Sequence, residues 1–433
     1  MAIYFNYIVG KIGGLRSSLI APDGTQSSTG DASRWGWLRV NSTRAGTFAR
    51  QPGGYAAFIP KPLPPHPPIQ MDSQLLELLS KADRTLGRLD GATEILPNPN
   101  LFVAMYVRQE AVLSSQIEGT QASLLDLLEL ELDNTRRQMP PDVEEVVNYV
   151  KAMNYGLQRL ETLPLSLRLI REIHEVLLKD SRGGERSPGE FRRTQNWIGP
   201  PGATLTNAVF VPPPVPEMVE ALNDLERFLR SEEPMPALVK CALAHVQFET
   251  IHPFLDGNGR LGRLLVTFML CEKGILRRPL LYLSLFFKQN RQEYYDRLMA
   301  VRTQGDFEGW IKFFLKGVAE ISAQATDTAR AILALREQHR GILSHNGLAN
   351  PSSLTLLERL YEHPMLTVSK AAELLDVTFP TANNIVGQFQ RLGLLEEVTG
   401  RQRRRLFAYR PYLRIFHHAG IDFETAASLA EFS

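Results

Sequence analysis

The chain has 433 residues, 44% of them hydrophobic and 22% charged, which is enough for a main core and a smaller second domain. Its formal net charge of +1 gives no global electrostatic argument for binding to nucleic acid or to a membrane. Cys241 and Cys271 lack ligand-like spacing, and the apolar opening of residues 2–9 is too short to span a bilayer, so we expect a cytoplasmic protein with no structural zinc.

Residues 1–52 mix Gly, Ser, Thr and Asp without sustained periodicity, which predicts a disordered or extended leader. Helical periodicity follows over residues 73–338, with one interruption. Within it, Ser114 and Glu118 lie four residues apart on one helix face, and Gly119 is placed to end that helix. By itself, such a glutamate is usually a solvated residue near a helix end.

The interruption falls between residues 188 and 214. Short apolar runs at 197–199 and 209–211 flank a turn rich in Gly and Pro, and this pattern predicts a β-hairpin. Without further context it would be an ordinary surface hairpin.

The most informative stretch is residues 252–263, HPFLDGNGRLGR. The imidazole of His252 has an ordinary pKa near neutrality and can take a proton from a hydroxyl nucleophile. Asp256 offers the hard oxygen ligands that suit Mg²⁺. The stretch therefore places a base beside a metal-binding carboxylate.

The same stretch also predicts a phosphate site. Residues 257–259, Gly-Asn-Gly, let the backbone aim successive N–H groups inward as an anion-binding nest at a helix N-terminus. Arg260 and Arg263 lie three apart on one helix face, and guanidinium groups bind phosphate oxygens two at a time. Each element alone is usually a turn, a bend or a solvated face, but the combination predicts a polyphosphate clamp with its own base.

This stretch resembles the signature of the Fic family, H-P-F-x-[DE]-G-N-G-R-x-x-R, and every specified position is filled. The resemblance implies an all-helical core that binds ATP with Mg²⁺ and transfers AMP to a Ser, Thr or Tyr hydroxyl of a target protein, which could be the protein itself. It implies His252 as the catalytic base and Asp256 as the metal ligand. The nucleotide-binding residues it implies are Glu118, Asp256, Gly257, Asn258, Gly259, Arg260, Leu261, Gly262, Arg263 and Tyr295.

Beside this motif, the run from Ser114 to Gly119 resembles the inhibitory helix of the family, [ST]-x-x-x-E-[GN]. The resemblance implies that Glu118 pairs with Arg263 in the place of the γ-phosphate, and hence a low basal activity. It also implies that the hairpin at 188–214 is a flap, to whose edge the target segment adds as a strand.

The last part of the chain has a different pattern, with a charged linker helix at 326–345 and a small domain and tail at 346–433. Helices are predicted at 353–362, 368–375 and 380–392, followed by strands at 394–398 and 405–409. This order is that of a winged helix-turn-helix.

The winged helix could bind DNA, or it could be a protein-interaction or homodimerisation module. The presumed recognition helix carries only one basic residue, Arg391. The candidate base contacts are Asn383, Asn384 and Gln388, and the candidate phosphate contacts are Arg401, Arg403, Arg404 and Arg405.

We therefore predict a mainly α fold, with a Fic-type helical core and hairpin flap in residues 53–325 and a small C-terminal winged helix-turn-helix. Three functions fit: AMP transfer restrained by Glu118, removal of AMP by the same residues, and DNA-binding regulation with a nucleotide-sensing core. Retention of His252 and Asp256 argues against the third, since sensing needs no base. The first is the function we expect.

Overall fold

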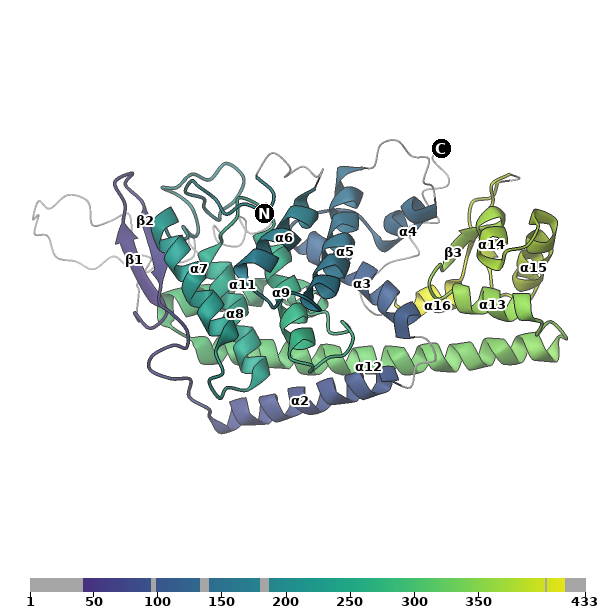
Figure 1. The fold of residues 1–433 in the computed structure, drawn as a ribbon, viewed down its shortest axis with the longest axis horizontal. Helices are drawn as coiled ribbons and strands as arrows, with labels where there is room; N and C mark the ends of the chain where they lie inside the picture. Colours follow the sequence, from purple (N-terminus) through teal and green to yellow (C-terminus); the bar gives the residue numbers. More distant parts are fainter. Residues whose placement is uncertain (1–41, 95–98, 133–139, 180–186, 402, 417–433) are drawn as a thin grey trace, which may run out of the picture.

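The computed structural model describes residues 42–94, 99–132, 140–179, 187–401 and 403–416. For residues 99–102 it describes the backbone alone. Its described part is mainly helical, with a few short strands at the two ends of the chain (Figure 1). Residues 1–41 and 417–433 lie outside the described residues. The mainly α fold class that the sequence predicts is confirmed.

The chain enters the described part through a two-stranded antiparallel ribbon, β1 (Gly46–Arg50) and β2 (Ala56–Pro60). The prediction of a disordered or extended leader up to residue 52 is therefore wrong for β1. Its anchors are not local, because Arg44 forms an ion pair of 2.7 Å with Glu308 and the fully buried Phe58 ties β2 to the core.

The core places two helices, α8 (Ala237–Ile251) and α9 (Asn258–Glu272), at its centre. Both are buried on nearly every side, as expected of helices that carry apolar residues all round. They are enclosed by α2 (Ser73–Glu94), α3 (Pro99–Ile117), α4 (Leu124–Leu132), α5 (Pro141–Leu160), α6 (Leu167–Leu178), α7 (Val215–Arg230), α10 (Ser284–Gln289), α11 (Arg291–Gln304) and α12 (Phe307–His345).

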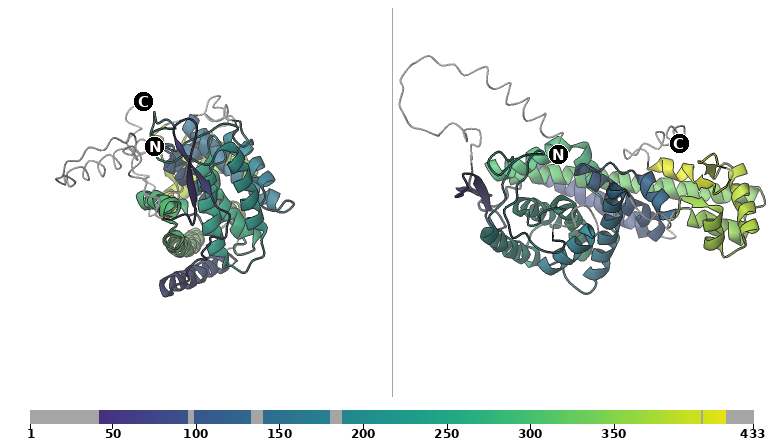
Figure 2. Two further views of the ribbon diagram at one scale, coloured as in Figure 1. Left: turned by 90° about the vertical axis from the view of Figure 1, so that its left-hand side faces the viewer. Right: turned by 90° about the horizontal axis from the view of Figure 1, so that it is seen from above.

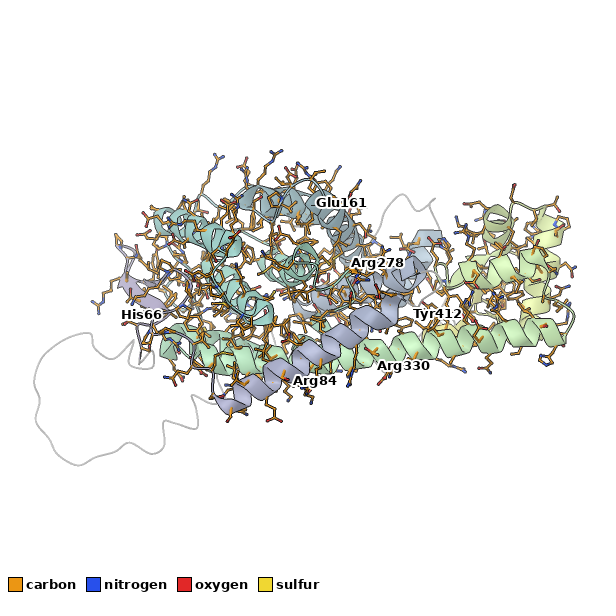
Figure 3. The ribbon with its side chains drawn as sticks, turned by 60° about the horizontal axis from the view of Figure 1, so that its bottom comes forward. His66, Arg84, Glu161, Arg278, Arg330 and Tyr412 are labelled. Carbon is orange, nitrogen blue, oxygen red and sulfur yellow. The ribbon has the colours of Figure 1, made fainter. Side chains whose placement is uncertain are left out.

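Helix α12 has 39 residues, so it is roughly 58 Å long, and α2 packs along it. Figure 3 shows the two helices side by side, with Arg84 on α2 and Arg330 on α12. The linker helix predicted at 326–345 is the last part of α12, whose buried stripe continues from the core through Ala325, Ala329 and Ile332. Neither α12 nor any other helix within the described ranges combines the length and apolarity needed to cross a membrane.

The C-terminal unit extends beyond the core along α12 (Figure 2). Its elements are α13 (Pro351–Arg359), β3 (Met365–Thr367), α14 (Val368–Leu375), α15 (Phe379–Arg391), β4 (Glu396–Glu397), β5 (Leu406–Ala408) and α16 (Arg410–Ile415). The antiparallel sheet has the order β3-β5-β4. This is the element order of a winged helix-turn-helix, with the short β3 and α16 added to the predicted elements. The unit meets the core where β3 contacts α4 and α16 contacts α12.

Candidate active site

A short loop joins the two central helices and carries the first half of the motif. Helix α8 ends at a left-handed His252, with φ 49°, and α9 begins after Gly257, with φ 74°. A left-handed non-glycine residue is uncommon and needs support from its surroundings. Phe254 provides part of that support, because it is fully buried and stacks on His174 with ring centroids 3.7 Å apart.

Asn258 closes this loop with its side chain. The Phe254 N–H donates to Asn258 Oδ1 at 2.9 Å, and Asn258 Nδ2 donates to the Phe254 carbonyl at 2.8 Å. The side chain of Asn258 is therefore committed to the loop, and only its backbone N–H is placed to take part in the predicted phosphate nest.

Two residues that the sequence did not single out hold the loop from the other side. Arg192 Nε donates to the His252 carbonyl at 3.1 Å, and Asn196 Nδ2 donates to the Phe254 carbonyl at 2.9 Å. Both side chains are buried. No spacing in the sequence links these positions to the motif, so they become visible only in the fold.

His174 is a third residue that sequence reasoning missed. Its Nδ1 accepts from the Gly189 N–H at 2.9 Å, which leaves Nε2 as the protonated nitrogen that donates to the Asp256 carbonyl at 3.0 Å. Burial lowers the pKa of His174 to about 4, so the ring is neutral at pH 7. It acts as a fixed donor and acceptor beneath the loop.

The N-terminus of α9 and two arginines form a cationic floor. The first N–H groups of a helix have no partner within the helix and favour anions. Arg260 and Arg263 are both buried, and Arg260 Nε has no hydrogen-bond partner within the described part of the chain. Arg260 Nη1 lies 3.4 Å from Glu145 Oε2. Arg260 Nη2 also lies 3.9 Å from Asp256 Oδ1, so carboxylates around the floor partly neutralise its positive charge.

Two predicted nucleotide-binding residues do not face this floor. Leu261 is fully buried in the core, and the backbone of Gly262 lies against the Glu249 carboxyl, where an added Cβ would clash. Neither lines the cavity. The reason is helical geometry, because the positions between Arg260 and Arg263 point to other sides of α9.

Glu118 occupies the floor from the end of α3. Arg263 Nη2 donates to Glu118 Oε1 at 2.8 Å, and Arg263 Nε donates to Ser114 Oγ at 2.8 Å. Helix α3 ends at Ile117, and Gly119 follows with φ 106°. Burial raises the pKa of Glu118, but the guanidinium groups of Arg263 and Arg260 outweigh it and hold the pKa below its ordinary value.

The carboxylate of Glu118 also blocks the nest sterically. A Cβ added to Gly259 would lie within clashing distance of Glu118 Oε1. The glutamate therefore fills space directly above the backbone that the sequence predicts to cradle phosphate.

The cavity above the floor has a volume of about 330 Å³. Its lining includes His252, Asp256, Glu118 and, as predicted, Tyr295. Opposite the motif, the predicted hairpin flap is reduced to a single antiparallel bridge between Ile198 and Phe210. Prolines follow both arms, at positions 200, 201 and 212–214, and they limit further pairing because proline has no N–H to donate.

Glu249 and Arg302, which the sequence did not single out, also line the cavity. Glu249 Oε1 is buried without a hydrogen-bond partner in the described structure, and burial raises the pKa of this carboxyl to about 7. Arg302 Nη2 donates to the Glu249 carbonyl at 3.0 Å. Burial, together with the Arg302 charge, lowers the pKa of His252 to about 3, so its imidazole is neutral at pH 7.

Comparison with known families bears on this arrangement. Residues 164–270 match the model of the Fic/DOC family, and residues 76–158 match the model of the Fic/DOC family N-terminal region. The chain thus contains a Fic domain preceded by a Fic N-terminal domain. The Fic match contains the whole motif of residues 252–263, and the N-terminal match contains Glu118.

Similar Fic proteins cover only part of the chain. A probable protein adenylyltransferase of Aquifex aeolicus is 32% identical over 181 residues, which are 40% of this chain and 51% of that protein. The protein adenylyltransferase Fic of Drosophila grimshawi is 31% identical over 175 residues, 39% of this chain and 32% of that protein. The chain thus spans about half or less of these relatives. A solved Fic family protein from Desulfovibrio desulfuricans, with 19% identity and a TM-score of 0.50, aligns with 79% of this chain and 97% of its own and supports the fold alone.

Asp256 of the Fic motif is suited to a bound Mg²⁺. The described residues contain no cluster of three or more His, Cys, Asp or Glu able to hold a metal by themselves. Mg²⁺, however, is commonly held by one or two carboxylates together with substrate phosphates and waters. Asp256 lines the cavity, its side chain is 37% exposed, and Oδ1 accepts from the Gly257 N–H at 2.8 Å. One oriented carboxylate beside a phosphate floor fits that pattern.

Proposed function

We propose that this Fic protein transfers AMP from ATP to a Ser, Thr or Tyr hydroxyl of a target protein, and that Glu118 restrains the transfer. The observation that carries the proposal is the placement of a neutral imidazole, a carboxylate and two guanidinium groups around one cavity. The names of the adenylyltransferase relatives support the reaction class.

In the proposed reaction, the target hydroxyl oxygen attacks the α-phosphorus of ATP. A new P–O bond forms at the α-phosphorus. The bond from the α-phosphorus to the oxygen that bridges the α- and β-phosphates breaks, and pyrophosphate leaves. The hydroxyl proton passes to His252, and Nε2 is the accepting nitrogen because Nδ1 is buried. The loop contacts of Arg192 and Asn196 keep the backbone carbonyl of His252 fixed during this transfer.

The phosphates would lie on the cationic floor. The N–H groups at the start of α9 and the guanidinium of Arg260 would bind the α- and β-phosphates, and Arg263 would bind the γ-phosphate. Asp256 would hold Mg²⁺, which supplies positive charge to the phosphate oxygens. These groups are fixed before substrate binds, so they stabilise developing charge without reorganising.

Glu118 competes for this floor in the proposed resting state. It pairs with the arginine that would bind the γ-phosphate, and it stands above Gly259. ATP could then bind only with its phosphates displaced from the position needed for attack. Activation requires α3 or its end to move, which makes the pair a switch between two states.

The test is incubation with Mg²⁺ and ATP labelled at the α-phosphate, followed by mass spectrometry of the protein. We expect label on Glu118→Gly, little label on the wild type and none on Glu118→Gly with His252→Ala. Glu131→Gln is the matched control, because Glu131 belongs to the neighbouring α4 and pairs with Arg108 instead. Absence of label from every variant would sink the proposal and favour the reverse reaction, removal of AMP.

We also propose that the C-terminal unit binds DNA. Asn383 and Asn384 are exposed on α15, which carries no acidic residue. Arg405 Nη2 donates to Asn383 Oδ1 at 3.2 Å, and Arg401, Arg403 and Arg404 are exposed on the adjoining wing. Gln388 fits this role poorly, because its Oε1 is buried.

Binding of a random 30-base-pair duplex by the full chain, measured by fluorescence anisotropy at two salt concentrations, tests this role. Replacing the four wing arginines with glutamine should weaken binding and flatten its salt dependence, because each phosphate contact releases counterions. Arg330→Gln on the exposed face of α12 is the control. No binding by the parent protein at low salt would remove DNA as a partner.

A further inference from the structure

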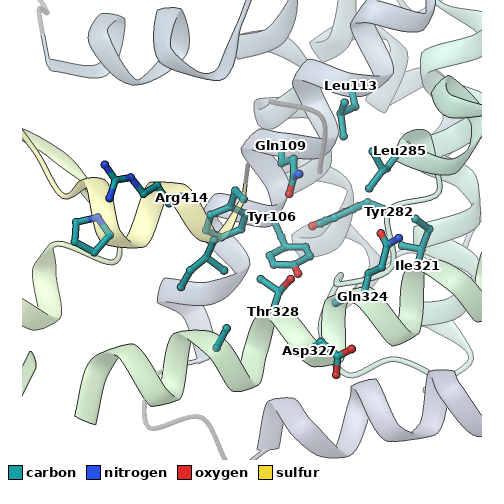
Figure 4. Close-up of a pocket in the computed structure, with 15 residues that line it drawn as sticks. Tyr106, Gln109, Leu113, Tyr282, Leu285, Ile321, Gln324, Asp327, Thr328 and Arg414 are labelled. Carbon is teal, nitrogen blue, oxygen red and sulfur yellow. The ribbon is translucent and has the colours of Figure 1, made fainter. Parts of the chain in front are cut away.

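A second cavity lies farther along α3, against a face of the helix next to the one that meets the active site. It has a volume of about 550 Å³ and is walled by α3, the start of α10, α12 and α16 (Figure 4). We call it the junction cavity, because it lies where the C-terminal unit meets the Fic core. Leu113 of α3 lines it, while the next residue, Ser114, binds Arg263 on the active-site side.

Three aromatic rings form one wall of the junction cavity. Tyr106 and Tyr282 stack with centroids 6.0 Å apart, and Phe416 meets Tyr106 edge-on at 5.7 Å. Each of the three residues is less than one-tenth exposed. A concave site with aromatic walls and a few polar groups is the usual form of a small-molecule site.

The polar groups in this wall are not fully used by the protein. Tyr282 Oη is buried and has no hydrogen-bond partner in the part of the chain that the structure describes. A buried hydroxyl without a partner is destabilising, so a bound acceptor would satisfy it. Figure 4 shows the Tyr282 hydroxyl directed toward Tyr106 and Gln109, whose side chain also lines the cavity.

The charge of the lining limits the class of ligand. Among its described residues, only Asp327 and Arg414 are charged; they are opposite in sign and both exposed. The guanidinium of Arg414 points away from the ring of Tyr106 (Figure 4). The remaining polar groups, on Gln109, Gln324 and Thr328, are neutral donors and acceptors. A phosphate group would find no counter-charge inside.

We propose that the junction cavity binds an uncharged heteroaromatic molecule of nucleoside size. Its ring would lie against the tyrosines, and its edge would accept from Tyr282 and pair with the glutamine amides. Because α3 lines both cavities, the ligand would fix the helix that presents Ser114 and Glu118 to Arg263. This regulatory consequence rests on the proposed function, whereas the binding itself does not.

Ligand-observed NMR on the full chain, with adenosine, guanosine, cytidine and uridine as probes, tests the binding. A non-hydrolysable ATP analogue and Mg²⁺ are present at saturation to fill the active site. Tyr282→Phe should weaken binding of the probe roughly three- to tenfold, the effect of one hydrogen bond. Ala325→Phe should abolish binding by filling the cavity. Tyr155→Phe removes a hydroxyl from α5 outside both cavities, where it donates to Glu172, and should leave binding of the probe unchanged.

The proposal is overturned if no probe binds, if the ATP analogue displaces every probe that does, or if Tyr282→Phe binds as tightly as wild type. Thermal unfolding checks that each variant is folded. If Ala325→Phe does not fold, Tyr282→Phe alone still decides the test. Hydrogen exchange of the α3 amides provides a second readout. A bound probe should slow this exchange whether or not the protein transfers AMP, so failure of the proposed function leaves this test intact.

Discussion

Arg263 Nη2 donates a hydrogen bond to Glu118 Oε1 at 2.8 Å across 145 positions of the sequence. The two partners are unequally buried, because the Arg263 side chain is 2% exposed and that of Glu118 is 39% exposed. The arginine is therefore fixed in the core, and the glutamate can leave toward solvent. The same guanidinium also donates to Ser114 Oγ at 2.8 Å and to the Ser114 carbonyl at 3.0 Å. One arginine therefore binds two residues that lie one turn apart at the end of α3.

Ser114→Ala should activate AMP transfer by loosening this attachment without removing Glu118. The change deletes one hydrogen bond to a charged group, which contributes about 1.5–3 kcal/mol, so we expect an increase of roughly ten- to a hundredfold. The increase should be smaller than that of Glu118→Gly, and the double variant should not exceed Glu118→Gly alone. The measurement is the initial rate of label incorporation.

Ser115→Ala is the matched control for this experiment. Ser115 lies next along α3 and is equally buried, but its Oγ has no hydrogen-bond partner in the described structure. Its loss should leave the rate unchanged. Equal activation by the two alanine variants would mean that α3 is merely destabilised and that Ser114 has no specific role.

The proposed base should show no titration near pH 6.5. Burial and the Arg302 charge lower the pKa of His252 to about 3, so the neutral form that accepts a proton persists as the pH falls to about 4. In the Glu118→Gly/Glu249→Gln background, which removes the titration of Glu249, kcat/KM should have no acid limb centred near 6.5. A limb at that pH would mean that the free enzyme exposes His252 to solvent.

Glu249→Gln should stabilise the fold increasingly as the pH rises. Burial raises the pKa of Glu249 from 4.5 to about 7, so between these values the folded protein holds a proton that the unfolded chain has lost. The free energy of unfolding of the wild type therefore falls with rising pH in this window. The difference in the free energy of unfolding between Glu249→Gln and the wild type should therefore grow by on the order of 3 kcal/mol between pH 5 and pH 8.

Urea unfolding at pH 5, 6, 7 and 8 measures this difference. The gain should reach a plateau above pH 7, where Glu249 is ionised in both the folded and the unfolded protein. A difference that is constant across all four pH values would show that this carboxyl keeps an ordinary pKa in the fold.

The sequence predicted the parts of the site that are contiguous. Residues 252–263 form one loop and one helix start, so their relative positions follow from local geometry, and Glu118 was found because a short pattern resembles the inhibitory helix of a known family. Arg192 and His174 could not be found in this way, because they reach the loop from two separate segments that only tertiary packing brings together. Glu249 lies only three residues before His252, in the last turn of α8, but its burial in the site depends on packing against other helices.

The errors in the predicted fold have equally physical origins. The predicted boundary at residue 326 does not begin a new helix, because the buried stripe of α12 continues across it through Ala325, Ala329 and Ile332. Strand β1 lacks a local signal, since an ion pair to Glu308 and pairing with β2 hold it in place. Leu261 could have been excluded from the site, because its position on α9 faces away from both arginines.

His174→Phe should raise the Mg²⁺ concentration needed for half-maximal AMP transfer. Phenylalanine can keep the stack on Phe254 but cannot bind the Gly189 N–H or the Asp256 carbonyl, so the segment carrying the proposed metal ligand loses its fixed position. The measurement is the rate in the Glu118→Gly background as a function of Mg²⁺ at constant ATP.

His245→Phe separates this effect from lost stability. His245 is also buried and neutral, with its pKa lowered to about 4 by burial, and its ring also makes two hydrogen bonds, to the Gly262 carbonyl and the Tyr294 hydroxyl. Both variants should unfold at lower urea, but His245→Phe should keep the Mg²⁺ dependence of its parent, because its partners lie away from Asp256. The same shift in both variants would show that His174 supports the fold and does not position the metal ligand.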